Sequence, residues 1–236
     1  MKLAIMQPYF FPYIGYFQLL ASVDKFVFYD DVGYIKNGWI NRNRIALNGT
    51  DHFITIPVKG GSCSKKIDAV HIDTSQTNFK RKLLNTLHSA YKKSEYFEET
   101  IPIVEEIIAS DEEYISNFAK RSVLAIKEWL DIKTEVTFSS RIYNNQHLHA
   151  QERVIDINKI EKSTIYINVE GGRSLYKREA FEMEGIDLRF LSPDIAEYTQ
   201  ITTPRFIPGL SIIDILMNIG KDGTKNLLHS AKTNNS

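Results

Sequence analysis

A segment near the beginning of the chain combines aromatic rings with a side-chain amide. Residues 7–16 read Gln-Pro-Tyr-Phe-Phe-Pro-Tyr-Ile-Gly-Tyr. Rings at Tyr9, Tyr13 and Tyr16 could stack on a nucleobase or a sugar, and Gly15 would let a ligand or backbone come close. Gln7 adds a hydrogen-bonding amide. The alternative is that the aromatic side chains, above all the two phenylalanines, only cover the edge of a sheet.

Paired carboxylates and two arginines follow further along the chain. Asp30 and Asp31 could orient an amine or act as the general base of a reaction. Arg42 and Arg44 could clamp a phosphate, and they share a face if residues 40–45 are extended. The alternative is a solvated loop in which Asp30 caps a turn. The same segment holds three further candidates for substrate binding: Lys36, Trp39 and Asn41.

A third candidate segment contains two consecutive glycines. Asn168 ends a β-rich stretch, and Gly171 and Gly172 precede a predicted helix that begins at Tyr176. Backbone amides at such a helix start can hold a diphosphate or a carboxylate. A plain turn explains the two glycines equally well.

Near the end of the chain, a predicted helix over residues 211–219 carries a fourth candidate pair. Ser211 is a suitable N-cap with Asp214 at the third helical position, an acidic variant of the capping box. Asn218 lies one helical turn after Asp214, so the two side chains share a face that could point toward the site. Local capping is the alternative role of Ser211 and Asp214.

Metal and thiol chemistry find little support in the sequence. The closest histidines are His147 and His149, and no zinc-binding motif surrounds them, so we expect no metal site. Cys63 lies beside two lysines, but its Gly- and Ser-rich surroundings indicate a loop, which seldom holds a catalytic triad. A single cysteine also excludes an intramolecular disulfide, which favours a reducing, cytoplasmic location.

The elements that must position these residues alternate between strand and helix patterns. A short apolar run at 2–6, a helical pattern at 16–23 and a β-rich run at 25–29 predict a right-handed parallel βαβ unit. A second unit is predicted from a strand at 164–168, a helix at 176–183 and a strand at 186–191. Residues 52–58 are typical of an exposed or antiparallel strand. The sequence therefore predicts an α/β fold with a Rossmann-like parallel sheet and ligands bound at the carboxyl ends of its strands.

A helical block interrupts this pattern. Apolar spacing predicts three helices between residues 77 and 130, with Pro102 in a first turn and Asp111 as an N-cap. We expect the N-terminal part of the α/β core at 1–75, a helical insertion or lobe at 76–132, the C-terminal part of the core at 133–225, and a frayed tail at 226–236.

Composition sets limits on the partners of the protein. The chain has 236 residues, of which 43% are hydrophobic and 25% charged, typical of a folded globular protein. It contains 29 Lys and Arg against 29 Asp and Glu, so no global positive field attracts nucleic acid or an anionic membrane. No signal peptide or membrane-spanning run is expected, and any site for a polyanion must be local.

Five segments together resemble the WbqC-like family. They are Gln7 to Gln18, Tyr29-Asp30-Asp31, Trp39 to Ile45, Tyr166 to Tyr176 with its two glycines, and Pro208 to Asn218. The resemblance spans residues 3 to about 223. Members of this family occur in bacterial surface-polysaccharide gene clusters, including O-antigen clusters, which implies a role in nucleotide-activated sugar metabolism.

The segment Tyr13-Ile14-Gly15-Tyr16 also resembles the His-x-Gly-His signature of nucleotidyltransferases, with both histidines replaced. Tyrosine has a pKa of about 10 and stays neutral at pH 7, so it cannot supply an imidazolium to a triphosphate. This second resemblance implies a nucleotidyltransferase-like N-terminal βαβ unit and does not imply adenylyl transfer.

Three functional hypotheses follow. The first is a transferase that acylates or aminoacylates the amine of a nucleotide-linked sugar, with Asp30 or Asp31 as base and an acyl carrier such as CoA or a carrier protein as donor. The second is nucleotidyl transfer or ATP-dependent ligation with magnesium. The third is a non-catalytic module that binds a nucleotide sugar. A homodimer is compatible with each of them.

Overall fold

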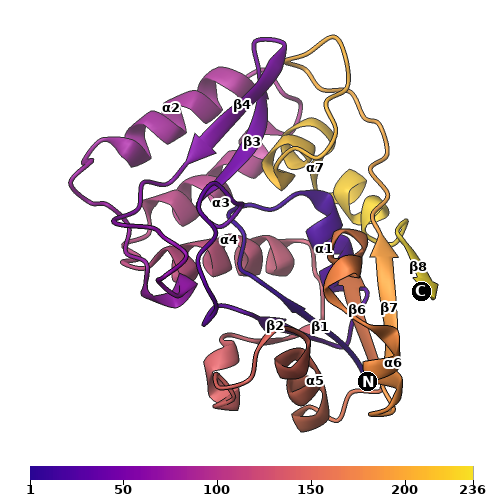
Figure 1. Cartoon of the computed structure of the whole chain (residues 1–236). Coiled ribbons are helices and arrows are strands. Elements are labelled where there is room, and N and C mark those ends of the chain that lie inside the picture. Colours follow the sequence, from indigo (N-terminus) through magenta and orange to yellow (C-terminus); the bar gives the residue numbers. More distant parts are fainter. Residues whose placement is uncertain (236) are drawn as a thin grey trace.

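The computed structural model describes residues 1–235 and contains a six-stranded, mostly parallel sheet (Figure 1). The strand order is β5-β2-β1-β6-β7-β8, and only β8 is antiparallel to its neighbour. The strands are β1 (Lys2–Met6), β2 (Lys25–Phe28), β5 (Glu135–Thr137), β6 (Ile165–Val169), β7 (Asp187–Ser192) and β8 (Lys232–Asn235). The predicted Rossmann-like α/β fold is confirmed, and both predicted parallel strand pairs are present.

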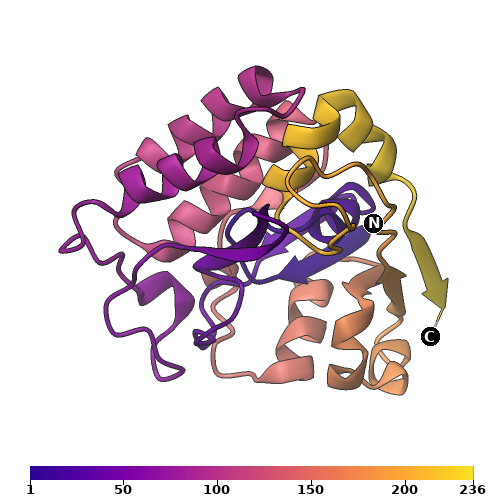
Figure 2. The same cartoon turned by 90° about the horizontal axis from the view of Figure 1, so that it is seen from above.

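Helices cover both faces of the sheet (Figure 2). One face packs on α1 (Ile14–Ala21), α4 (Ile115–Trp129) and α7 (Ile212–Leu228), and the other packs on α5 (Ala150–Ile160) and α6 (Arg178–Glu182). Side chains of the strands alternate between the two cores: Ala4 lies in the larger core, whereas Leu3 and Ile5 lie in the smaller one. This alternation follows from the two-residue period of a β-strand, and it explains why the central strands are apolar throughout.

The chain reverses its direction of travel across the sheet between β1 and β6. Strands β2 and β5 follow on one side of β1, whereas β6 and β7 lie on its other side. In open α/β sheets, ligands bind outside the carboxyl ends of the strands at such a reversal. The topology therefore directs attention to the loops that follow Met6 and Val169.

The crossover from β2 to β5 carries an antiparallel hairpin and the helical block. The hairpin consists of β3 (Arg42–Leu47) and β4 (Thr50–Thr55), and it is followed by the short 3₁₀ helix η1 (Ile67–Ala69). The three helices predicted after it are α2 (Phe79–Tyr91), α3 (Phe97–Ala109) and α4. The antiparallel strand and all three helices are thus confirmed.

Two details of the helical block differ from the prediction. Helix α3 begins at Phe97, so Pro102 lies inside the helix, beyond its first turn. Helix α4 begins at Ile115 with Tyr114 as its N-cap residue, so Asp111 caps no helix. The local signal, Pro102, placed the start of α3 too late. Buried apolar residues before it, such as Phe97 and Ile101, make the helix begin earlier.

The end of the chain also differs from the prediction. The predicted helix does end near 219, because Gly220 has a non-helical φ of 68° and kinks α7 there. A further helical segment then continues to Leu228, and residues 232–235 pair with β7 as β8 instead of fraying. A short polar strand is stabilised here by ladder hydrogen bonds to the sheet edge, which a sequence pattern does not reveal. Ser236 lies outside the described residues. None of the helices in the described chain is both long enough and apolar enough to span a bilayer.

Candidate functional site

A cavity of about 570 Å³ lies at the carboxyl ends of β1 and β6. We call it the switch-point cavity. Its walls come from both strands, from the loops after them, from residues 29–39 and from α5. The lining residues are Ile5, Met6, Gln7, Tyr9, Tyr13, Tyr29, Ile35, Trp39, Ala150, Gln151, Val154, Asn168, Val169, Gly171, Gly172, Leu175 and Tyr176.

The aromatic loop after β1 is anchored by its two phenylalanines. Phe10 and Phe11 are fully buried, and the carbonyl oxygens of both accept hydrogen bonds from the Asn43 side chain at 3.0 and 2.7 Å. The Ser211 hydroxyl also donates to the Phe11 carbonyl. The structural alternative is therefore correct for the phenylalanines. Because this loop is fixed, the residues on either side of the phenylalanines have defined positions.

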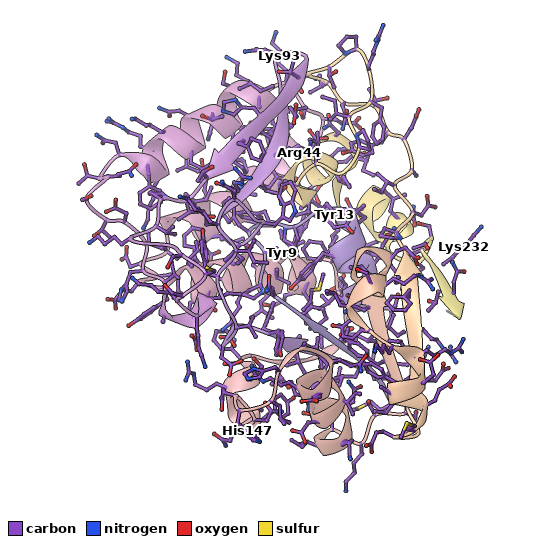
Figure 3. All side chains as sticks on the ribbon, in the orientation of Figure 1. Tyr9, Tyr13, Arg44, Lys93, His147 and Lys232 are labelled. Carbon is purple, nitrogen blue, oxygen red and sulfur yellow. The ribbon has the colours of Figure 1, made fainter. Side chains whose placement is uncertain are left out.

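Tyr9 and Tyr13 line the cavity, and Figure 3 shows both residues near the middle of the molecule. A Cβ atom at Gly15 would come within 2.5 Å of the Tyr13 ring, so glycine is required for this ring to lie where it does. Burial raises the pKa of both tyrosines above the ordinary value. Both phenols are neutral at physiological pH and offer ring faces and hydroxyl groups rather than charge.

Gln7 supplies the unpaired polar group of the cavity. Its backbone carbonyl accepts a hydrogen bond of 2.9 Å from the hydroxyl of Tyr16, which is fully buried beneath the loop. The side-chain Oε1 of Gln7 is buried and has no hydrogen-bond partner. A buried acceptor without a partner costs about 1–3 kcal/mol, which a ligand donor would offset. Tyr16 thus does not line the cavity and instead positions Gln7.

The opposite wall is built around Asn168. Its side-chain amide donates to the hydroxyls of Tyr166 at 2.9 Å and Tyr176 at 3.1 Å, and its oxygen accepts from the Val169 amide. All of these bonds hold the wall in place. Tyr176 lines the cavity, and burial raises the pKa of its phenol.

Gly171 and Gly172 line the cavity but do not form the predicted seat at a helix start. They lie inside the 3₁₀ helix η3 (Glu170–Leu175), and α6 begins only at Arg178. A Cβ at Gly172 would approach the Asn168 side chain to 3.0 Å, whereas Gly171 faces open space. The two glycines therefore leave room beside Asn168 and shape the cavity wall.

Asp30 lies in a buried ion pair outside the cavity lining. One of its carboxylate oxygens is 2.5 Å from Nζ of Lys120, and both side chains are 2% exposed. Further hydrogen bonds come from the hydroxyls of Ser116 and Ser139 and from the Ser140 backbone amide. Lys120 belongs to α4, so this contact ties the end of β2 to the helical block.

Asp31 forms a second buried pair beside the first. Arg153 donates to both carboxylate oxygens at 2.7 Å, and Ser140 and Gln146 donate as well. Burial alone raises the pKa of Asp31, but these hydrogen bonds outweigh it and hold the pKa below the ordinary value. We call the residues around Asp30 and Asp31, with Lys120 and Arg153, the ion-pair cluster.

Tyr29 connects the cluster to the cavity. The Arg153 guanidinium carbon lies 4.9 Å from the centre of the Tyr29 ring, which lines the cavity. The ion-pair cluster thus contacts the cavity wall through Arg153 and Tyr29. Within the described chain, the lining of the cavity includes no Asp, Glu, His, Lys or Arg side chain, so the cavity is neutral and polar through amides and phenols.

The predicted pair of arginines lies on β3, and the two residues have different surroundings. Arg42 donates to the Gly38 and Asn37 carbonyls and lies over the Phe53 ring. Arg44 lies over the Trp39 ring and pairs with Asp51 at 3.1 Å. Strand β3 is extended as the shared-face argument requires, but neither arginine lines the switch-point cavity.

The remaining candidates lie elsewhere. Lys36 is exposed in the loop after β2, and the buried Asn41 bonds to the Tyr34 hydroxyl and the Ile56 carbonyl.

Asp214 is fully buried in α7, where it accepts hydrogen bonds from three side chains: those of Tyr91, Tyr198 and Gln200. Burial raises its pKa despite these bonds. Asn218 donates to the Asp214 carbonyl, so this pair braces α7 and does not reach the cavity.

Sequence reasoning missed Tyr29 and the α5 residues of the wall. Gln151 and Val154 come from α5, a helix far away in the sequence, and nothing in the apolar spacing of that helix marks them as lining a cavity. Tyr29 could have been found, because it is the first residue after β2 at the predicted binding edge.

The fold is that of a Rossmann-like α/β protein, with a cavity at the reversal of strand order. The chain belongs to the WbqC-like protein family, whose family model matches residues 7–226. It is also 29% identical over 225 residues to the uncharacterised Mycobacterium tuberculosis protein Rv1507c, covering 94% of this chain and 95% of that protein. No solved structure matches it significantly.

Proposed function

We propose that the chain is a transferase that binds a nucleotide-linked amino sugar in the switch-point cavity. The acceptor amine would receive an acyl or aminoacyl group in surface-polysaccharide biosynthesis. The choice of sugar metabolism rests on the resemblance to the family. The choice of location rests on the structure, because this cavity lies where α/β sheets bind nucleotides.

One observation carries the proposal: a neutral, ring-lined cavity is lined by Gln7, whose buried side-chain oxygen has no hydrogen-bond partner. Tyr9, Tyr13 and Trp39 offer faces for a base or a sugar ring. The Oε1 atom of Gln7 offers an acceptor to an N–H or O–H donor of the ligand. Such a surface suits nucleosides and sugars, which combine flat or ring-shaped bodies with many hydrogen-bonding edges.

The diphosphate of such a ligand would lie at the rim and not in the interior. Two exposed lysines, Lys36 and Lys177, directly follow the lining residues Ile35 and Tyr176. Exposed ammonium groups hold phosphate without the desolvation penalty that a buried charge would impose. The ligand's charge would thus stay in water while its rings enter the cavity.

The chemical step in this proposal forms a bond from the sugar amine to the carbonyl carbon of an activated acyl donor. The bond from that carbon to the donor's leaving group, a thiolate or a phosphate, breaks, and the amine gives up a proton to a base. The cavity would contribute by orienting the amine, an effect that can lower a barrier substantially. Asp30 or Asp31 as base remains a proposal. Either carboxylate would have to exchange its cation for the amine, because Lys120 and Arg153 now occupy them.

A second candidate function is a binding module without catalysis. The observation in its favour is that the described lining residues include no Asp, Glu, His or Lys, the side chains that most often act as general acid or base. A module that recognises a nucleotide sugar would need the same rings and amides. Turnover, and not affinity, separates the two candidates.

Calorimetric titration of nucleotide-linked amino sugars, free nucleotides and ATP with Mg²⁺ tests the proposal, followed by turnover assays with acyl and aminoacyl donors. We expect a nucleotide-sugar complex that weakens about tenfold in Gln7→Ala, the loss of about one good hydrogen bond. Gln76→Ala removes an exposed glutamine outside the cavity and should bind like the parent protein. Binding without turnover on any donor would favour the module, and binding of ATP with Mg²⁺ alone would contradict both candidates.

A further inference from the structure

A second, smaller cavity adjoins the switch-point cavity. It has a volume of about 270 Å³ and is lined by Tyr9, Pro12, Tyr13, Trp39, Asn43 and Gly209. Three of these residues, Tyr9, Tyr13 and Trp39, also line the switch-point cavity. The two cavities are therefore neighbours with a common aromatic wall, the arrangement that a reaction between two bound molecules requires.

Apart from its phenols and the indole N–H of Trp39, the described lining of the small cavity has no free hydrogen-bonding side chain. The Asn43 amide is occupied, because it donates to the Phe10 and Phe11 carbonyls and its oxygen accepts from the Arg44 amide at 2.8 Å. Rings and a proline make up most of the remaining surface. Such a lining suits a short apolar group, and any polar end of a ligand must be recognised at the edge.

Arg44 supplies a cation at that edge. Its guanidinium carbon lies 5.7 Å from the Trp39 ring centre, and its Nη2 lies 3.8 Å from where a Cβ of Gly209 would be. Gly209 has a positive φ of 68°, so a side chain there would be strained as well as close to this group. Arg44 therefore lies beside two residues of the small-cavity lining.

One donor of Arg44 is unused. Its Nη1 pairs with Asp51, whereas its Nε is buried and has no hydrogen-bond partner. Arg42 differs, because its Nε and Nη2 donate to backbone carbonyls. A buried guanidinium N–H without an acceptor is costly, and an oxyanion of a ligand is the acceptor that satisfies it best.

We propose that the small cavity is the donor subsite, and that it takes a small acyl donor whose oxyanion is held by Arg44. This inference rests on the proposed transferase, whose acceptor would occupy the neighbouring cavity. The donor is an acyl phosphate: the acceptor amine forms a bond to the acyl carbon, the bond from that carbon to the phosphate oxygen breaks, and inorganic phosphate and a proton leave. The apolar lining holds the acyl group, and Arg44 holds the phosphate. In this proposal Arg44 provides the cation alone. The sequence instead predicted that Arg42 and Arg44 act together from one face of the extended segment.

The two tryptophans of the chain allow a direct test. Trp129 lies in α4, so Trp129→Phe leaves Trp39 as the only indole, next to Arg44. We would titrate this protein with acetyl phosphate, acetate and inorganic phosphate at constant ionic strength and record indole fluorescence. The expected result is a saturable change with acetyl phosphate at a lower concentration than with acetate, which has no leaving group and serves as the control. Tighter binding of acetate than of acetyl phosphate would contradict an acyl phosphate donor.

Arg44→Gln should weaken this binding at least tenfold, whereas the matched variant Arg42→Gln should bind within twofold of the parent. Calorimetry on the protein with both tryptophans repeats the comparison if Trp129→Phe fails to fold. No saturable binding of any of the three anions, or equal binding by Arg44→Gln, would overturn the inference.

The nucleotide-sugar titration keeps the two proposals separate. Arg44→Gln should retain nucleotide-sugar affinity, because Arg44 does not line the switch-point cavity. Nucleotide-sugar binding without anion binding would end the donor-subsite inference alone. Anion binding without nucleotide-sugar binding would instead remove the proposed function.

Discussion

Two neighbouring regions at the carboxyl ends of the strands differ in charge and in how completely their polar groups are hydrogen-bonded. The switch-point cavity is neutral, lined by rings and amides, and leaves a buried acceptor of Gln7 unpaired. The ion-pair cluster after β2 is charged, closed and satisfied, with Asp30 and Asp31 each bound to a cation and several donors. Unsatisfied groups indicate where a ligand can bind, whereas satisfied buried charges indicate where the fold is fixed.

This difference bears on how acidic residues are interpreted in a sequence. Consecutive aspartates at a strand end fit a catalytic site and a structural brace equally well. What separates the two roles is the partner, and here the partners are Lys120 and Arg153, about 90 and 120 positions further along the chain. The acids can be located from the sequence, but their partners cannot.

The largest expected effect tests the structural role of the cluster. Asp30→Asn should lower the free energy of unfolding by about 3–5 kcal/mol, because it leaves the charge of Lys120 buried and unpaired. Urea denaturation measures this loss. The exposed pair of Glu170 and Arg173 is the control, and Glu170→Gln should leave the denaturation curve almost unchanged, because exposed ion pairs contribute little to stability.

Adding Lys120→Met to Asp30→Asn should recover most of that stability, since the uncompensated charge is then gone. A double variant as unstable as Asp30→Asn alone would mean that the cost does not come from the orphaned ammonium. A stable Asp30→Asn single variant would contradict the bracing role altogether.

Acid titration should reveal the contribution of Asp31. Its pKa is lowered in the folded protein, so its contribution to stability is complete above its unfolded pKa of about 4 and is lost as the pH falls through the folded pKa. Unfolding free energies measured between pH 6 and pH 2.5 should therefore decline more steeply in the parent than in Asp31→Asn. Parallel curves would show that Asp31 is not coupled to folding.

The buried Asp214 should behave in the opposite sense. Burial raises its pKa in the folded protein, so stability is lost as the pH rises from about 4 through the folded pKa. Asp214→Asn should reduce this loss and flatten the dependence of stability on pH in that window. The same set of denaturation curves measures it, and a steeper dependence in the variant would contradict the assignment.

A smaller effect is expected on the cavity side. Gly15→Ala places a methyl group against the Tyr13 ring, so the ring must move, at a cost of about 1–3 kcal/mol in stability. Nucleotide-sugar affinity should fall as well, because Tyr13 faces both cavities. Gly171→Ala is the matched control for stability alone, since a Cβ there meets nothing within 4 Å although the residue lines the cavity. Unchanged affinity in Gly15→Ala would remove Tyr13 from the binding surface.

Much of the fold could be predicted, because it depends on local patterns. The apolar runs of β1 and β2, the second βαβ unit and the three helices of the block all have clear periodicity, and each is present. The start of α3 and the strand β8 could not be predicted in this way. Both depend on tertiary partners, a buried face for Phe97 and the exposed edge of β7 for residues 232–235.

The residues that line the switch-point cavity could be predicted where they depend on position along a strand, but not where they depend on distant partners. Gln7, Tyr9 and Tyr13 line the cavity because they follow β1, as the topology requires. Asn41 and Asp214 have the same chemical types as binding residues, but buried partners bind both of them. The role of Tyr16 is indirect, because its hydroxyl holds the backbone of Gln7.

The most direct test of the account compares one variant from each region on the same ligand. Calorimetry with a nucleotide-linked amino sugar would give Kd for the parent, for Gln7→Ala and for the double variant Asp30→Asn with Lys120→Met. We predict a Kd about tenfold weaker for Gln7→Ala and a Kd within twofold of the parent for the double variant. Unchanged binding in Gln7→Ala together with lost binding in the folded double variant would contradict the account and place the ligand at the ion-pair cluster.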